Sequence, residues 1–270
     1  MLDEGHSFVA TLVFYSLSMV CYFIFFMLRN EKFSSYGSLL VKVGILFHTI
    51  ALSSRTVMAS RLPLANQYEF ATSFAWGIAI SFVGFEWKYR FKALGTFVTP
   101  IILLVGFYAA LQTRDIRPLM PALQSNWITI HVSTAIFSYG AFAIACGISI
   151  MFLIRDRFQE DGFIKEYIPN FEILDMISYR AIALGFIMLT VVIISGAIWA
   201  EKAWGRYWQW DPKETWSFIT WIIYAIYLHV RLSKGWKNKK AAWFAILGFI
   251  AILFTYIGVN TLLVGYHSYA

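Results

Sequence analysis

The feature that most constrains this chain is a series of long apolar stretches separated by short polar ones. Eight such stretches occur, at about 8–28, 37–54, 70–86, 93–111, 129–154, 181–200, 215–231 and 241–262. Runs of about 20 apolar residues are typical of membrane-spanning helices. Strands of a membrane barrel would instead alternate apolar and polar residues. The sequence therefore predicts an all-α integral membrane protein, a bundle of about eight transmembrane helices with short outward loops.

The apolar excess extends over the whole chain. Of its 270 residues, 59% are hydrophobic and 14% are charged, whereas soluble domains carry roughly 25% charged residues. We therefore expect a single polytopic membrane domain over 1–270 and no soluble domain. No cleavage site follows a charged leader, so the first stretch is expected to stay as a helix.

Lysine and arginine are divided unequally between the two sets of loops that eight helices define. One set carries 15 and the other 7. Basic residues concentrate in cytoplasmic loops, so both termini and the 201–214 loop are predicted to face outward. The charged segment 155–180 is predicted to be a cytoplasmic loop with a short interfacial helix. The net charge of +7 follows from this rule and requires no nucleic-acid partner.

Aromatic residues are concentrated between the sixth and seventh stretches, in WGRYWQWDPKETW. Trp204, Tyr207, Trp208 and Trp210 lie within seven residues there. Tryptophan also forms belts at membrane interfaces, but a belt is spread around the bundle rather than gathered in one loop. The cluster therefore favours stacking on a large flat ligand. Asp211, just before a proline, is expected to cap the seventh helix.

Two histidines are predicted at the same depth as this aromatic loop. His131 begins the fifth helix and His267 follows the eighth, both on the outward side. Imidazole is a common axial ligand of haem iron. A solvated helix cap is the simpler interpretation of either residue alone. Basic residues near them can pair with haem propionates, namely Arg114, Arg117, Arg206 and Lys213.

Two further histidines, His48 and His229, lie inside predicted spans. Ionisable residues within a membrane usually face the protein interior and serve function. The alternative is a hydrogen bond that joins two helices. His6 lies in the outward N-terminal tail and is given no role.

Several segments together resemble a known family. WGRYWQWDPKETWSF resembles the WWD motif of the haem-handling proteins of cytochrome c biogenesis. The surroundings of His131 (NWITIHVSTAIFSYGAF) and of His267 (GYHSY), and the stretch RLPLANQYEFATSFAW at 61–76, are similar to that family's other outward segments. The number of spans and the residues after WD favour its CcsA (ResC) branch, which belongs to the system II pathway.

This resemblance implies haem transport across the membrane and haem attachment to the CxxCH thiols of apocytochrome c. The partner would be a CcsB/ResB-type membrane protein, and the chain would be the membrane component of a cytochrome c synthase. Its contribution to catalysis would be limited to positioning haem b. The implied location is the bacterial inner membrane, with the plastid thylakoid membrane as the alternative.

The resemblance also implies roles for individual residues. His131 and His267 would be axial ligands of haem iron at the WWD loop of about 201–216, where Trp204, Tyr207, Trp208, Trp210 and Asp211 would line the haem site. His229 matches the family's intramembrane ligand, whose partner would come from CcsB. His48 is a second candidate for that inner site.

Three other functions remain open at this point. The chain can be a haem exporter or chaperone without attachment activity. It can be a bis-haem electron-transfer subunit, although that function favours two histidine pairs inside the spans. It can also transport another aromatic compound, with the histidines as proton relays. Haem absorbance and thioether formation distinguish these functions.

Overall fold

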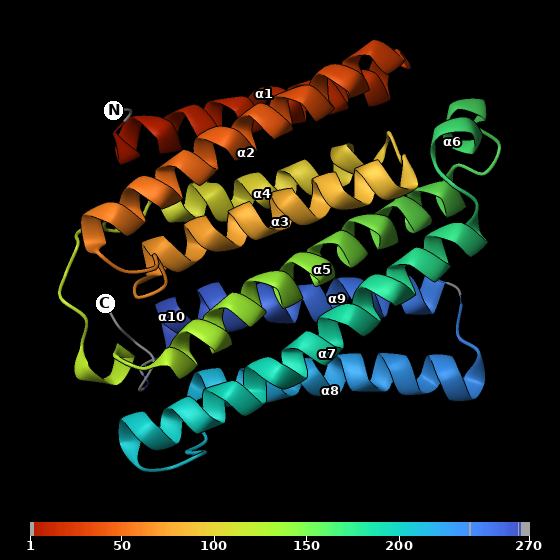
Figure 1. Cartoon of the computed structure of the whole chain (residues 1–270). Coiled ribbons are helices and arrows are strands. Elements are labelled where there is room, and N and C mark those ends of the chain that lie inside the picture. The colour runs from red at the N-terminus through yellow and green to blue at the C-terminus, as the bar shows by residue number, and fades with distance from the viewer. Residues whose placement is uncertain (1–2, 238, 264, 266–270) are drawn as a thin grey trace.

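The computed structural model describes residues 3–237, 239–263 and 265, and within them it contains helices and no strand (Figure 1). The elements are α1 (Glu4–Leu28), α2 (Glu31–Ala59), α3 (Gln67–Tyr89), α4 (Leu94–Ala110), η1 (Pro121–Leu123), α5 (Asn126–Arg157), α6 (Gly162–Tyr167), α7 (Phe171–Trp204), α8 (Pro212–Lys234), α9 (Lys239–Leu253), η2 (Phe254–Gly258) and α10 (Val259–Leu262).

Each of the eight apolar stretches falls on a long helix, which confirms the all-α membrane fold. Among the described residues, five helices are long and apolar enough to cross a membrane, namely α1, α2, α5, α7 and the continuous run from α9 to α10. α4 is apolar but shorter, and α3 and α8 are not among these five. The chain is a multi-pass membrane protein.

The segment 155–180 contains a short helix, as predicted, but its predicted length as a loop is wrong. α5 continues to Arg157 and α7 already begins at Phe171, so only short connections flank the small helix α6. Capping fixes the starts of α6 and α7, because the side chains of Asp161 and Asn170 accept backbone N–H groups there. These caps satisfy backbone donors that a helix start leaves unpaired.

α1 and α2 form a tightly packed antiparallel hairpin. Their buried residues recur at alternating steps of three and four, as in a coiled coil, and include Glu4, Phe8, Thr11, Tyr15, Ser18, Tyr22 and Phe25 on α1 and Ser34, Gly37, Val41, Gly44, His48, Ala51 and Arg55 on α2. Glycine lets the aromatic rings approach: a Cβ on Gly44 would lie 2.5 Å from the Tyr15 ring, and one on Gly37 would lie 2.8 Å from the Tyr22 ring.

α5 lies at the centre of the bundle, between α3 and α4 on one side and α7 and α9 on the other (Figure 1). Of its most apolar 18-residue window, 83% is buried. Small residues allow this close packing. A Cβ on Gly140 would lie 3.2 Å from the Gly77 carbonyl oxygen of α3.

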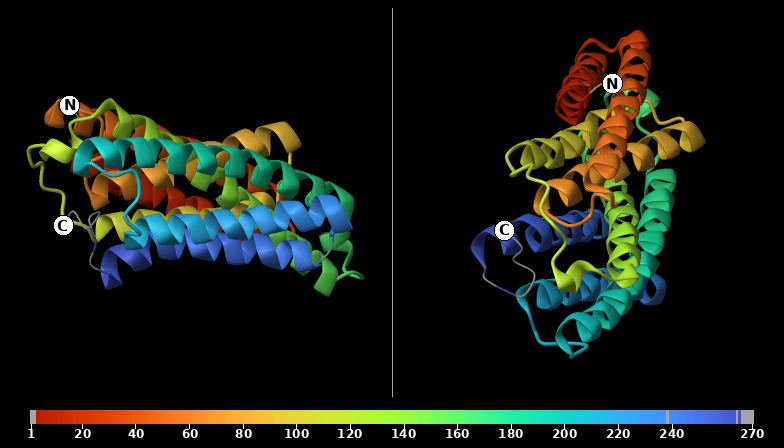
Figure 2. Two further views of the ribbon diagram at one scale, coloured as in Figure 1. Left: turned by 90° about the horizontal axis from the view of Figure 1, so that it is seen from below. Right: turned by 60° about the vertical axis from the view of Figure 1, so that its left-hand side comes forward.

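The described chain begins and ends at the end of the bundle that also carries η1 and the 205–211 loop, while α6 lies at the opposite end (Figures 1 and 2). We call the end with the 205–211 loop the outer end. The helix order agrees with the predicted common side for both termini and the Trp-rich loop.

A buried ionic cluster connects the hairpin to the outer end of α3. The Nε group of Arg55 lies 3.0 Å from Oε1 of Glu69, and a terminal guanidinium nitrogen of Arg61 lies 2.6 Å from Oε2. Glu4 of α1 pairs with Arg55 at 3.3 Å. Arg55 and Glu69 are 2% and 0% exposed, so each desolvated charge depends on its partners. The Ala65 N–H also donates to Glu69 at 2.8 Å, which fixes the chain that leads into α3.

Candidate functional site

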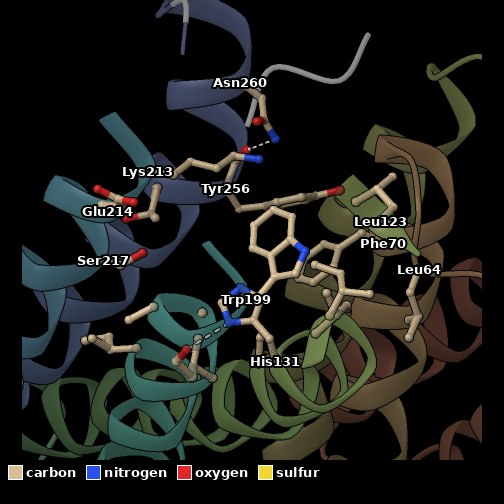
Figure 3. Close-up of a pocket in the computed structure, with 18 of the residues that line it drawn as sticks. Leu64, Phe70, Leu123, His131, Trp199, Lys213, Glu214, Ser217, Tyr256 and Asn260 are labelled. Atoms are coloured by element: carbon tan, nitrogen blue, oxygen red, sulfur yellow. Dashed lines mark hydrogen bonds between the residues drawn. The ribbon is translucent and has the colours of Figure 1, made fainter. Parts of the chain in front are cut away.

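A cavity with about 1120 Å³ of empty space, its open side included, lies at the outer end of the bundle (Figure 3). Seven helical elements contribute to its lining: η1, α3, α5, α7, α8, the π-helical turn η2 and α10. Its lining includes Leu64, Gln67, Phe70, Leu123, His131, Tyr139, Trp199, Tyr207, Trp208, Lys213, Glu214, Ser217, Tyr256 and Asn260. Large, mostly apolar pockets with a few polar groups are typical ligand sites.

His131 occupies the second turn of α5 and points into this cavity (Figure 3). Its Nδ1 lies 2.8 Å from the Val192 carbonyl oxygen of α7. A carbonyl only accepts, so Nδ1 carries the proton and Nε2 carries the lone pair. Gly196 provides the space, since a Cβ there would lie 2.8 Å from the imidazole ring. The geometry thus holds the imidazole in the tautomer that a metal requires.

Trp199 forms the aromatic wall next to this histidine. Its ring is nearly parallel to that of His131, with an interplanar angle of 20° and a centroid separation of 6.3 Å. The indole is 1% exposed, and its Nε1 donates to the Ala122 carbonyl at 2.7 Å. Trp204 meets it edge-on at 4.8 Å. These contacts fix Trp199 rigidly between η1 and α7.

The predicted Trp-rich loop is shorter in the structure than in the sequence analysis. Trp204 is the last residue of α7, and Gly205, at φ 72°, ends that helix in the left-handed conformation, which glycine adopts without strain. Tyr207 and Trp208 reach the cavity, whereas Trp204 and Trp210 are not among its lining residues. The prediction of one non-helical segment for the whole cluster is therefore wrong.

Trp210 has an unusual conformation for a bulky residue. Its φ is 57°, a region that costs side-chain-bearing residues about 1–3 kcal/mol. The side chain is 67% exposed and meets Trp208 edge-on at 5.7 Å. The exposed Trp210 ring therefore lies on a strained stretch of backbone at the surface of the loop.

The expected helix cap at Asp211 is confirmed. Its side chain accepts the Lys213 N–H, and the Glu214 carboxylate accepts the N–H groups of Asp211 and Gln209, at 3.2 and 2.8 Å. This capping box fixes the loop to the first turn of α8. Asp211 is 4% exposed and supports the loop rather than lining the cavity.

The chain after α10 returns to this cap. A Cβ on Gly265 would lie 2.4 Å from Oδ1 of Asp211 and 3.0 Å from Cδ of Pro212. His267, predicted as an outer ligand, lies outside the described residues, and its role stays a prediction.

Lys213 alone among the described lining residues carries a side chain that is positively charged at neutral pH. It lies at the start of α8, ahead of the apolar stretch 215–231. Burial lowers the pKa of its ammonium to about 8, and the nearby Asp211 carboxylate acts in the opposite direction. The other basic candidates, Arg114, Arg117 and Arg206, do not line the cavity.

Sequence reasoning missed the wall that Tyr256 and Asn260 contribute. The predicted span 241–262 is interrupted by the π-helical turn at Phe254–Gly258, which directs Tyr256 toward the cavity. The Tyr256 hydroxyl donates to the Gln67 carbonyl at 2.9 Å. Extra-residue turns of this kind often occur at functional sites, but they leave no pattern in composition. Leu64, Gln67 and Phe70 lie within the segment 61–76 that was singled out by resemblance.

The structure does not bring His48 to the cavity. His48 is 0% exposed, inside the hairpin, with its Nδ1 3.2 Å from the Tyr15 hydroxyl. The Phe8 ring lies beside it, at a centroid distance of 5.9 Å. Its position fits the helix-joining hydrogen bond that the sequence left open.

His229 is exposed on α8, three turns or more from the cavity end of that helix. On the exposed face of α8 it lies in one row with Ile222 and Ile226, which are 37% and 44% exposed. This row faces away from the buried residues Tyr224 and Tyr227. His229 is therefore available to a group outside this chain and does not belong to the outer cavity.

Fold and cavity together define a multi-pass helical membrane protein with an aromatic, histidine-containing pocket at the outer end. Residues 64–267 match the family model described as "Cytochrome C assembly protein". The chain belongs to the cytochrome c assembly protein family, and this membership gives it a role in cytochrome c maturation.

Individual relatives agree with this assignment. The chain is 37% identical to the cytochrome c biogenesis protein CcsA of Guillardia theta, over 94% of this chain and 92% of that protein. It is 40% identical to the CcsA protein of Chlamydomonas reinhardtii, over 89% of this chain and 70% of that protein. The CcsA protein of Prochlorococcus marinus (strain CCMP1986 / NIES-2087 / MED4) is 36% identical, over 97% of this chain and 92% of that protein.

A solved structure has the same fold. The chain superposes on the cytochrome c haem lyase CcmF with a TM-score of 0.74 at 15% identity, over 94% of this chain. It spans 46% of that protein, so the likeness shows the shared helical architecture.

Proposed function

We propose that this chain receives haem b in the outer cavity and presents it to apocytochrome c for thioether formation, together with a CcsB/ResB-type partner. The observation that carries the proposal is His131. Its imidazole is held in the metal-ligating tautomer in the wall of a large aromatic cavity.

The lining of the cavity supports a porphyrin as its ligand. Tyr207 and Trp208 supply flat apolar surface against which a macrocycle can stack. His267 is proposed as the second axial ligand, from the C-terminal tail.

For the attachment chemistry, this chain has to do little more than position haem beside the thiols. Addition of a thiol to a vinyl group forms one C–S bond and leaves the thiol proton on the other vinyl carbon, with no oxidant consumed. Holding the vinyl edge still beside an incoming CxxCH segment is the contribution that a rigid pocket makes. The membrane component of a cytochrome c synthase can thus act without an acid–base residue of its own.

The inner part of the haem path is proposed to lie at His229. Its exposure on α8 supports a site shared with another membrane protein, because no described histidine of this chain faces it. His48 is retained as a second candidate, and the inside of the hairpin would have to open for it to bind haem. The proposed location is the bacterial cytoplasmic membrane, with the thylakoid membrane as the alternative.

The test is coexpression with the partner and a c-type cytochrome reporter, using His131→Ala and the matched control His6→Ala. His6 is an exposed histidine at the same end of the molecule, with a side chain that is 84% exposed. We expect His131→Ala to abolish haem-stained cytochrome c and to change the haem absorption of the purified complex. Added imidazole should partly restore maturation, and His6→Ala should behave as wild type.

Two outcomes would change the proposal. Wild-type maturation by His131→Ala without imidazole would remove the outer site. Haem binding by the wild-type complex without any thioether product would leave a haem exporter or chaperone, the second function that the sequence left open.

A further inference from the structure

Five aromatic rings of α7, α8 and the loop between them follow one another in a continuous row, which we call the aromatic ladder. Phe186 of α7 lies 5.1 Å from Trp221 of α8 between ring centroids, and Trp221 stacks on Phe218 at 6.2 Å and 10°. Phe218 meets Trp208 edge-on at 6.2 Å, and Trp208 meets Trp210 edge-on at 5.7 Å. All five rings are partly or largely exposed. The two helices lie side by side at one edge of the bundle (Figure 1).

The aromatic ladder joins the outer cavity at Trp208. That ring lines the cavity and also contacts Phe218. On α8, Ser217 lines the cavity, whereas the next residue, Phe218, is 37% exposed and is not among the lining residues. The ladder therefore connects the cavity with the exposed side of α8.

The same side of α8 leads to His229. His229 follows Phe218 by about three helical turns, so both residues lie on one side of the helix. Ile222 and Ile226, between them, are exposed as well. At a rise of about 1.5 Å per residue, this surface is about 16 Å long. An exposed apolar surface thus joins the ladder to the histidine that is proposed for the inner site.

The interior of the bundle is closed beneath the cavity. Next to Tyr139 of the cavity wall, Phe142 of α5 stacks on Tyr224 of α8 with a centroid distance of 3.8 Å and an angle of 13°. Both rings are 0% exposed. A Cβ on Gly185 would lie 2.9 Å from the Phe142 ring, and one on Gly248 would lie 2.5 Å from the Tyr224 ring. A flat ligand that moves from one end of the bundle to the other therefore has to move along its outside.

We propose that the aromatic ladder is the surface along which the porphyrin moves from the side of His229 into the outer cavity. This inference rests on the proposed function and deepens it. Offset and edge-on contacts with aromatic rings are both favourable, so a planar macrocycle can exchange one ring of the ladder for the next without losing its aromatic neighbour. Trp208 belongs to the ladder and to the cavity wall, and is the last ring before the site.

The chemistry of this surface favours a flat ligand over a helix of another protein. Helices that pack together in a membrane meet through small residues that let the backbones approach. Phe218, Trp221 and Trp208 instead present large rings. Trp221 is also held in place, because its Nε1 donates to the Thr190 hydroxyl of α7 at 2.9 Å.

The experiment compares two ways of loading the outer cavity of the full chain together with its partner. In cells haem arrives from the inner side, so cytochrome c maturation reports delivery. Iron protoporphyrin IX added to the purified complex in detergent reaches the cavity from solution, and the haem absorption that depends on His131 reports affinity. We expect Phe218→Leu, which removes the ring and keeps an apolar side chain, to lower maturation about three- to tenfold. The affinity for added haem should not change.

Two matched variants complete the test. Phe218→Tyr keeps the ring and should retain both maturation and affinity. Phe23→Leu removes a ring that is 41% exposed on α1, outside the ladder, and should change neither quantity. Maturation is expressed per amount of complex, and the partner content of each purified complex is measured.

Three results would overturn the inference and leave the proposed function in place. Wild-type maturation by Phe218→Leu would remove the ring from the route. Equal losses of maturation and affinity would make Phe218 part of the cavity site. Loss of the partner would make this side of α8 a surface for docking a helix. If the wild-type complex shows no haem absorption that depends on His131, the inference and the proposed function both fail.

Discussion

The α1–α2 hairpin and the cavity region treat aromatic residues in opposite ways. In the hairpin, glycines lie beneath Tyr15 and Tyr22, and the rings fill the space between the helices completely. Around the cavity, Trp199 and Trp208 line space that the protein does not fill. The family model begins at residue 64, after the hairpin. The hairpin is thus a closely packed structural unit, and the proposed binding site lies at the outer end of α3–α10.

The largest expected effect lies where the two regions join. Glu69→Gln leaves Arg55 and Arg61 with a buried excess of positive charge, and losing one partner of a buried pair costs about 3–5 kcal/mol. We expect a marked drop in the thermal unfolding midpoint in detergent. Glu160→Gln is the control, because that carboxylate is 94% exposed in its ion pair with Lys165. Equal midpoints for the two variants would show that the cluster does not tie the regions together.

Gly196→Ala is expected to damage the site and spare the fold. The added Cβ would lie 2.8 Å from the His131 ring, which is too close, so the ring would have to move and its hydrogen bond to Val192 would break. A misplaced ligand can reduce activity on the order of 10²-fold, so we expect low cytochrome c maturation with a near-normal unfolding midpoint. Gly162→Ala is the control, since a Cβ there has no neighbour within 4 Å. A normal haem spectrum in Gly196→Ala would contradict the assigned role of this contact.

Gly44→Ala, in the hairpin, is expected to destabilise the fold and to leave the site intact. Its Cβ would lie 2.5 Å from the buried Tyr15 ring, and overpacking of this kind costs about 1–3 kcal/mol. We predict a lower unfolding midpoint, with the haem spectrum of the remaining folded protein unchanged. Gly84→Ala, a helical glycine with open space around it, serves as the control. A shifted haem spectrum in Gly44→Ala would break the separation between the two regions.

The smallest effect on stability is expected at Trp210. Trp210→Gly relieves a left-handed conformation and should leave the free energy of unfolding unchanged or raise it by about 1 kcal/mol. Loss of the exposed ring should nevertheless lower cytochrome c maturation, and Trp210→Phe should retain most of it. A less stable Trp210→Gly variant would mean that the ring contributes packing rather than binding.

Much of the fold could be predicted from the sequence because its signal is strong. Long apolar runs specify helices, and an even number of them places both termini at the same end of the bundle. The proximity of His131 to Tyr207 and Trp208 followed from their common depth. The direction in which single side chains point could not be predicted, because the position of a histidine in a span gives its depth in the membrane and not the face of the helix on which it lies. His48 lies inside the hairpin and His229 outside the bundle. Only the step of three and four residues that His48 shares with Gly44 and Ala51 could have indicated its burial.

The contribution of Tyr256 and Asn260 to the cavity wall could not be predicted for a different reason. A π-helical turn inserts one residue into an otherwise regular helix, and nothing in FTYIG distinguishes it from the apolar helix around it. The direction of Tyr256 depends on that insertion. The Lys213 side chain was one of four basic candidates, and only the folded arrangement of α8 against α5 and η2 selects it.

The position of the π-helical turn late in the chain also determines when the cavity can form during synthesis. Among the described residues of the cavity wall, Tyr256 and Asn260 lie closest to the C-terminus, and a chain emerging from the ribosome delivers its N-terminal parts first. The hairpin can pack while synthesis continues, but the pocket has to wait until its last wall is inserted. An unfinished chain therefore has no complete site in which to trap a reactive porphyrin.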